Sequence, residues 1–184
     1  MATPDMSAAV HDVLTESQRL GFLGARPIAE VVEHARSFVT ALDGVVGSVA
    51  DIGAGGGVPG LVIAHDRPDL LLTMIDRRAK RTDFLQRMVR RLRWSDCVTV
   101  VTADVESLLD DAPSAFDAVV ARGFGPPDVT LSLATGLVRI GGRVVISEPP
   151  VGDRWSPEQL AELGVCRLEH ADHTVAVFRR DGFT

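Results

Sequence analysis

The sequence lacks a hydrophobic run long enough to cross a bilayer, because no stretch approaches about eighteen uninterrupted apolar residues. The first residues, Met1 to Ser7, also lack the basic segment and apolar core of a secretory signal. Cysteine is scarce: Cys97 and Cys166 stand alone, without the spacing of a disulfide framework or a zinc site. We therefore expect a cytoplasmic chain with two reduced thiols, no membrane span and no bound metal.

The composition is otherwise that of an ordinary globular protein of 184 residues, with 46% hydrophobic and 24% charged residues. This length fits one structural domain with a substantial core. The net charge of −6 argues against a nucleic-acid partner, but the charge is unevenly spread. Residues 77–93 contain eight Lys or Arg and one Asp, leaving 11 basic and 24 acidic residues elsewhere. The basic segment is either a steering surface or a solvated helix face.

Hydrophobic periodicity predicts an α/β fold in which strands and helices alternate. Helices are expected at 7–20, 27–42, 80–92 and 127–137. Two further helices are expected to start directly after the glycines near residue 58 and at Ser156. Strands are expected at 45–52, 70–75, 97–102, 116–121, 143–147, 165–170 and 174–179, with Gly141–Gly142 as the turn into the fifth.

This alternation predicts a doubly wound parallel sheet that binds its ligand at the carboxyl ends of the strands. The last two strands have no helix between them, so they must pair antiparallel as a closing hairpin. We expect residues 1–44 to form a helical cap and residues 45–184 to form the ligand-binding domain.

The stretch from Asp51 to Gly60, Asp-Ile-Gly-Ala-Gly-Gly-Gly-Val-Pro-Gly, follows the first strand. Glycines permit a sharp turn and let a ligand approach backbone N–H groups, and Pro59 suits the first turn of a following helix. Gly55 to Gly60 matches the dinucleotide pattern GxGxxG, with Asp76 placed for a ribose hydroxyl. That pattern should begin where the strand ends, near Ile52, and here it begins late.

The earlier register suits S-adenosylmethionine instead. Asp51 can hold the cationic amino end of this cofactor, while residues 53–55 admit its adenosyl part. Asp76 can accept hydrogen bonds from both ribose hydroxyls, and residues 104–106 follow the third strand, where adenine would lie. Helix capping would explain any one of these acids but explains the set poorly. The residues predicted to contact the cofactor are Asp51, Gly53, Ala54, Gly55, Asp76, Arg77, Asp104, Val105, Glu106 and Arg122.

Four further features narrow the assignment. They are Val58-Pro59-Gly60 in the glycine turn, Asp76 followed by Lys80-Arg81 and Phe84-Leu85, Phe116-Asp117 leading into Ala121-Arg-Gly-Phe124, and His34 before the first strand. With them the chain resembles the class I S-adenosylmethionine-dependent methyltransferases. More narrowly, it is similar to the glucose-inhibited-division-B family of guanine-N7 methyltransferases of small-subunit ribosomal RNA.

The resemblance implies a seven-stranded Rossmann-like methyltransferase sheet ending in an antiparallel hairpin, S-adenosylmethionine as cofactor and ribosomal RNA as partner. Arg122 is the candidate active-site residue, because it could hold a phosphate or a base edge bidentately; the alternative is a salt bridge to Asp51 or Asp117. His34 is a second candidate, and Phe124 could stack a base or pack in a loop. The residues expected to contact RNA are Arg78, Lys80, Arg81, Arg87, Arg90 and Arg91.

Two departures from the family pattern remove positive charge. Glu33 stands where the family usually has Arg, and Ser147-Glu-Pro-Pro150 replaces a Lys-Gly pair after the fifth strand. Two alternatives therefore remain beside the RNA methyltransferase: a small-molecule methyltransferase of the same fold, and a non-catalytic cofactor-binding or nicotinamide-binding protein. We expect a monomer or a weak oligomer.

Overall fold

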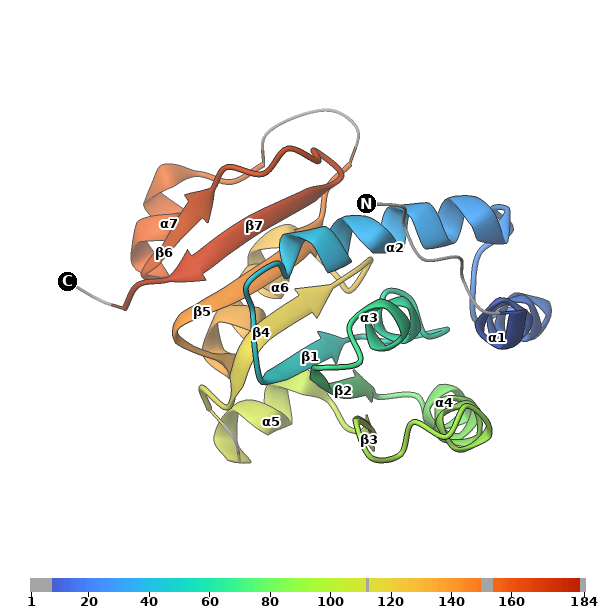
Figure 1. Cartoon of the computed structure of the whole chain (residues 1–184). Helices are drawn as coiled ribbons and strands as arrows, with labels where there is room; N and C mark the ends of the chain where they lie inside the picture. Colours follow the sequence, from blue (N-terminus) through green and yellow to red (C-terminus); the bar gives the residue numbers. More distant parts are fainter. Residues whose placement is uncertain (1–7, 112, 150–153, 183–184) are drawn as a thin grey trace.

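A central sheet is flanked by helices on both faces in the computed structural model, which describes residues 8–111, 113–149 and 154–182 (Figure 1). The described strands form one seven-stranded sheet in the order β3-β2-β1-β4-β5-β7-β6. They are β1 (Ser48–Ile52), β2 (Leu71–Asp76), β3 (Val98–Thr102), β4 (Phe116–Ala121), β5 (Val138–Ser147), β6 (Val165–Leu168) and β7 (Val175–Arg180). The predicted fold class is confirmed.

The topology places a ligand crevice between β1 and β4. β1 pairs in parallel with β2 on one side and with β4 on the other, and chain connections reverse direction at this point. Open α/β sheets bind ligands at such a switch point, outside the carboxyl ends of the strands. β7 pairs antiparallel with both β5 and β6, so the predicted closing hairpin is confirmed.

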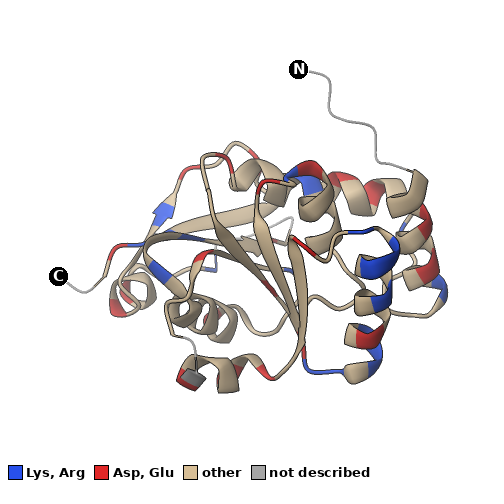
Figure 2. Cartoon of the chain, turned by 60° about the horizontal axis from the view of Figure 1, so that its bottom comes forward, with Lys and Arg blue, Asp and Glu red and all other residues tan. Residues whose placement is uncertain are grey.

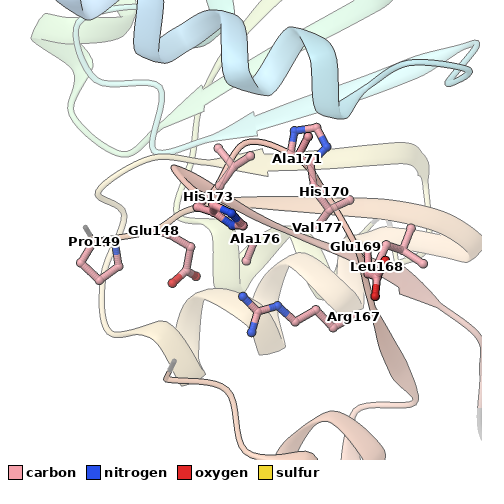
Figure 3. Close-up of a pocket in the computed structure, with 11 residues that line it drawn as sticks. Glu148, Pro149, Arg167, Leu168, Glu169, His170, Ala171, His173, Ala176 and Val177 are labelled. Atoms are coloured by element: carbon pink, nitrogen blue, oxygen red, sulfur yellow. The ribbon is translucent and has the colours of Figure 1, made fainter. Parts of the chain in front are cut away.

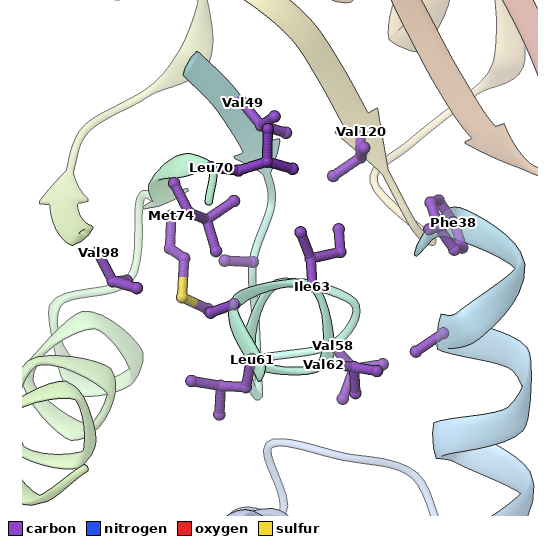
Figure 4. Packing of buried hydrophobic residues seen from close by; sticks show 14 of the residues in the cluster. Phe38, Val49, Val58, Leu61, Val62, Ile63, Leu70, Met74, Val98 and Val120 are labelled. Atoms are coloured by element: carbon purple, nitrogen blue, oxygen red, sulfur yellow. The ribbon is translucent and has the colours of Figure 1, made fainter. Parts of the chain in front are cut away.

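The helices divide between the two faces of the sheet. The described helices are α1 (Ala8–Arg19), α2 (Ile28–Ala41), α3 (Gly60–Asp66), α4 (Ala79–Arg91), α5 (Val105–Asp111), α6 (Pro127–Leu137) and α7 (Pro157–Glu162). The first four contribute to one buried cluster, and the last three contribute to the cluster on the opposite face. α3 lies at the centre of the first cluster, where Ile63 packs among side chains of β1, β4 and α2 (Figure 4).

The N-terminal helices share this core with the rest of the chain. Val13 and Leu14 of α1 and Phe38 of α2 are fully buried in the same cluster as α3 and α4. Because these apolar stripes face the sheet-covering helices, α1 and α2 are held close to the loop that follows β1. None of the described helices is both long and apolar enough to cross a membrane.

The local structure differs from the sequence prediction in two places. Gly141–Gly142 lies inside β5, which starts at Val138 and shifts its register on β4; a Cβ on Gly142 would lie 2.7 Å from the backbone oxygen of Asp117. The glycine pair therefore forms an irregularity within the strand rather than a turn before it. Pro59 follows a cis peptide bond and caps α3 without joining its first turn. Residue Ser7 of the first predicted helix and Pro150 lie outside the described residues.

Candidate active site

A cleft of about 520 Å³ opens beside the glycine loop, at the carboxyl ends of β1, β2, β3 and β4. Its volume lies in the range of small-molecule sites. Its lining residues are Gly53, Asp76, Arg77, Arg78, Arg81, Ala103, Asp104, Val105, Glu106, Gly123, Phe124, Gly125, Pro126, Val129 and Leu133. Six of the residues predicted to contact the cofactor meet here, whereas Asp51, Ala54, Gly55 and Arg122 do not line the cleft.

The glycines after β1 are required by backbone conformation and by space. Gly53 and Gly55 have φ values of 70° and 53°, which L side chains rarely adopt. A Cβ on Gly53 would also lie 2.6 Å from the Phe124 ring, so this ring packs over the start of the loop. At Gly55 the nearest atoms would lie 3.6 Å away. A Cβ at Gly55 would thus make ordinary van der Waals contacts with Arg81 and the Gly53 oxygen, while Phe124 forms part of the cleft wall.

Asp76 joins the glycine loop to the start of α4. Its Oδ2 accepts a hydrogen bond from the Gly55 N–H at 2.9 Å, and its Oδ1 accepts one from the Arg78 N–H at 2.9 Å. The Arg81 guanidinium reaches Oδ2 at 3.4 Å. A carboxylate offers about four lone-pair sites. Three of these sites are occupied, so Asp76 can accept one further hydrogen bond, on Oδ1, as one ribose hydroxyl would require.

The far wall of the cleft combines an acidic turn with an apolar helix face. Asp104 Oδ1 accepts from the Glu106 N–H at 3.3 Å, so this acid also caps α5. Val129 and Leu133 of α6 line the cleft opposite. The sequence prediction missed these two, although their spacing of four places them on one face of the predicted helix. Together they form a slot with polar edges and apolar walls, which suits a purine ring.

Asp51 lies beneath the glycine loop and is closed to solvent. Its Oδ2 accepts from the Gly60 N–H at 3.0 Å, whereas Oδ1 is buried without a hydrogen-bond partner. Burial raises the pKa of Asp51 to about 7, against the opposing effects of the Gly60 hydrogen bond and the Arg122 charge. A buried carboxyl with one unpaired oxygen is favoured in its charged form by a nearby cation. The residues present thus fit a cofactor with a cationic end above this loop.

Arg122 and His34 approach the crevice from β4 and α2. Ile52 pairs with Ala121, so Arg122 directly follows β4 beside Gly53. Arg122 makes no ion pair with a described acid, and burial followed by the nearby Arg26 charge lowers its pKa. Burial and the Arg122 charge likewise lower the pKa of His34, so this imidazole is neutral at pH 7.

Neither of the alternative partners suggested for Arg122 forms a salt bridge with it. Asp117 lies at the opposite end of β4, where its Oδ1 binds the Arg139 guanidinium at 2.6 Å and its Oδ2 accepts from the Ser48 N–H at 2.7 Å. Asp51 influences Arg122 only through its charge. Among the described residues, the partly buried guanidinium of Arg122 thus has no acidic partner.

The residues predicted to contact RNA divide into two groups. Arg87, Arg90 and Arg91 are exposed on α4, and basic residues run along this helix and the loop before it (Figure 2). Arg91 also pairs with Glu16 of α1 at 3.4 Å. Arg78 and Lys80 are exposed as well, but Arg78 lines the cleft. Arg81 points into the cleft toward Asp76, away from the exposed face.

A larger cavity, of about 820 Å³, lies beyond β5, beside the turn between β6 and β7 (Figure 3). Glu148, Arg167 and His173 point toward one another within it. Glu148 accepts a hydrogen bond from Trp155 Nε1 at 2.6 Å, so this departure from the family pattern has a structural role. No cluster of three His, Cys, Asp or Glu side chains that could bind a metal occurs in the described parts of the chain.

The sheet order, the glycine turn after β1 and the acids that end β2 and follow β3 define a protein of the Rossmann-like methyltransferase class. Residues 5–151 match the family described as "GidB: rRNA small subunit methyltransferase G", and the chain belongs to this family. The resemblance inferred from the sequence is therefore confirmed.

Similar proteins agree with this assignment. The chain is 32% identical over 123 residues to a ribosomal RNA small subunit methyltransferase G from Thermotoga neapolitana, covering 67% of this chain and 53% of that protein. It is 33% identical over 159 residues to the protein of that name from Burkholderia ambifaria, covering 80% and 66%. The chain thus spans about half to two thirds of these relatives.

A solved structure shows the same fold. It is a putative S-adenosyl-L-methionine-dependent methyltransferase from Methanococcus maripaludis, with a TM-score of 0.59 and 16% identity, covering 80% of this chain and 67% of that one.

Asp51 should make the folded protein less stable as the pH rises. Its folded-state pKa of about 7 exceeds the ordinary 3.8, so the folded state binds more protons between these values and stability falls across that window. Asp51→Asn removes this titration and keeps an oxygen for the Gly60 N–H. We expect the free energy of unfolding of the variant, measured relative to that of the wild type, to increase from about pH 4 to 7, by at most about 4 kcal/mol. Urea unfolding across this range measures the difference.

Asp117→Asn is the matched control, because it should change stability with pH in the opposite direction. The Ser48 N–H, followed by the Arg139 guanidinium, lowers the pKa of Asp117, so its charge stabilises the fold above pH 4. Parallel pH profiles for wild type and Asp51→Asn would contradict the assigned titration.

Proposed function

We propose that the chain binds S-adenosylmethionine in the 520 Å³ cleft and methylates ribosomal RNA, at guanine N7 as the family resemblance implies. The observation that carries the proposal is the arrangement of Asp76. This carboxylate is fixed by the glycine loop on one side and by α4 on the other, yet retains a free acceptor site on Oδ1 at the cleft. The family membership and the basic face of α4 support an RNA acceptor.

The chain's own residues account for cofactor binding. Asp76 would accept from one ribose hydroxyl on Oδ1, and from the second on Oδ2 once Arg81, 3.4 Å away, yields that site. Residues 104–106 with Leu133 would enclose the adenine. Gly55 leaves room for the adjoining part of the molecule. Asp51 would stabilise the cationic amino end from beneath the loop, and its own ionisation would be favoured in return. When bound, this cofactor supplies a methyl group activated by a sulfonium.

The acceptor chemistry requires positioning more than proton transfer. Guanine N7 has a free lone pair and carries no proton, so accepting a methyl group there would require no base from the protein. A neutral His34 is therefore compatible with the reaction but is not needed as a base. Arg122 would bind a phosphate or the guanine edge and hold N7 in line, an effect that can lower the barrier substantially.

The exposed arginines of α4 supply a surface for the RNA backbone. Phosphate contacts of this kind give affinity and orientation without reading sequence. The acidic remainder of the chain would repel RNA elsewhere and so restrict docking to this side.

Deletion of the gene followed by mass mapping of small-subunit ribosomal RNA tests the proposal. We expect one guanine N7 methylation to disappear and to return when the wild-type gene is restored. Unchanged ribosomal RNA methylation, with tight S-adenosylmethionine binding by the purified protein, would favour a small-molecule acceptor. Binding of a nicotinamide dinucleotide without S-adenosylmethionine binding would refute the methyltransferase function.

Gly55→Val should abolish detectable S-adenosylmethionine binding. Gly55 has a φ of 53°, where a β-branched residue is strained by about 1–3 kcal/mol, and the new side chain would pack against Arg81 at the edge of the cleft. Calorimetric titration measures the loss. Gly24→Val is the matched control, because that position has an ordinary φ and no atom within 4 Å of a new Cβ. Normal binding by Gly55→Val would refute the loop's assigned role.

Arg122→Ala should lower turnover by about 10- to 100-fold while cofactor affinity changes less than about twofold, because the side chain contacts the acceptor. Methyl transfer to purified small ribosomal subunits and cofactor titration separate the two effects. Arg139→Ala is the matched control, since Arg139 binds Asp117 at the opposite end of β4. Weakened cofactor binding with unchanged turnover would contradict the assignment.

A further inference from the structure

Helix α1 contacts the glycine loop directly, although the two are distant in sequence. The Ser17 hydroxyl donates a hydrogen bond of 2.8 Å to the carbonyl oxygen of Gly56, 39 residues later. The side chain of Ser17 is 0% exposed, so water cannot take its place. A helical serine can instead bond to the carbonyl four residues before it. Here the hydroxyl donates its hydrogen bond to the loop and not to a carbonyl of its own helix.

The turn after α1 closes around the same glycine. A Cβ on Gly56 would lie 2.6 Å from both Leu23 Cγ and Ser17 Oγ. Gly56 is buried, and neither it nor Ser17 or Leu23 lines the cleft. α1 and its following turn therefore support the loop from the side away from the ligand.

The turn after α1 is itself packed against α4. The Phe22 and Phe84 rings meet edge to face with their centroids 5.5 Å apart. The apolar face of α1 is fully buried in the core cluster that includes α4. Ser17 is thus presented to the loop by a fixed helix, which makes its hydrogen bond an effective constraint.

The bond acts on a defined part of the loop. It fixes the carbonyl of the peptide between Gly56 and Gly57, whose N–H donates to the Ala54 oxygen at 2.8 Å. On the other side, the Gly55 N–H is held by Asp76. The peptide between Gly55 and Gly56 lies between these two fixed peptides and enters no hydrogen bond within the described chain. Gly55 is partly exposed and Gly56 is buried, so the Gly55 side of this peptide is the part that a ligand can reach, in an orientation set by its neighbours.

We propose that Ser17 is a positioning residue for the cofactor: it holds the Gly56–Gly57 peptide so that the preceding peptide is oriented to bind S-adenosylmethionine. Ser17 does not touch the cofactor, and the inference rests on the proposed function. Through Ser17, α1 would contribute to the geometry of the cofactor site.

Calorimetric titration of the whole chain with S-adenosylhomocysteine tests this role. Ser17→Ala should weaken binding about five- to tenfold, the size expected for one buried hydrogen bond. Ser37→Ala is the matched control: Ser37 is a buried helical serine whose hydroxyl bonds to Thr174 at 2.9 Å, away from the glycine loop. It should lower thermal stability similarly and leave affinity within about twofold. Faster amide exchange at Gly57 in Ser17→Ala would accompany the loss.

Undiminished affinity in Ser17→Ala, or an equal loss in Ser37→Ala, would overturn the positioning role while leaving wild-type binding and the proposed function intact. Absence of binding by the wild type would instead refute the proposed function. If Ser17→Ala does not fold, Leu23→Ala tests the same support without removing a buried hydrogen bond. It should weaken binding about two- to threefold, and unchanged binding would overturn the proposal.

Discussion

One carboxylate, Asp76, connects the parts of the molecule that must act together. It ends β2, receives the Gly55 N–H from the loop after β1, and receives the Arg78 N–H at the start of α4. A shift of either element would leave a nearly buried acid short of donors, which is costly. The cleft therefore has a defined width before any ligand enters. The basic helix α4 is tied to the same point, so a partner on that helix is placed relative to the cleft.

The second constraint is the charge around the crevice. Asp51 is buried with one unpaired oxygen, while Arg122 stands nearby without a described acidic partner. Burial makes both charges unfavourable, and each lowers the cost of the other without a direct salt bridge. Each of these two charges lacks an ion-pair partner among the described residues. A cation above the loop would satisfy Asp51, and an anion or base edge at the mouth would satisfy Arg122.

Much of the fold and of the cleft could be predicted from the sequence, because short stretches of neighbouring residues indicate them. The seven strands follow from short apolar runs bounded by turn residues, and the missing helix between the last two determines their antiparallel pairing. The acids at strand ends converge because parallel strands end at one edge of a sheet. Gly141–Gly142 was misjudged as a turn, since a glycine pair has the same composition in a turn and in a strand irregularity. Only the pairing partner distinguishes them.

The contacts that escaped prediction are those between elements distant in sequence. Nothing near Ser17 marks its hydroxyl as a partner of Gly56, because the helix pattern specifies only which face is buried. Arg81 was grouped with the arginines of α4 by its charge, yet its position one turn into the helix directs it back to Asp76. The same basic segment therefore contains a residue of the cofactor cleft and residues of an exposed surface. Position relative to the strand end, rather than charge, separates the two.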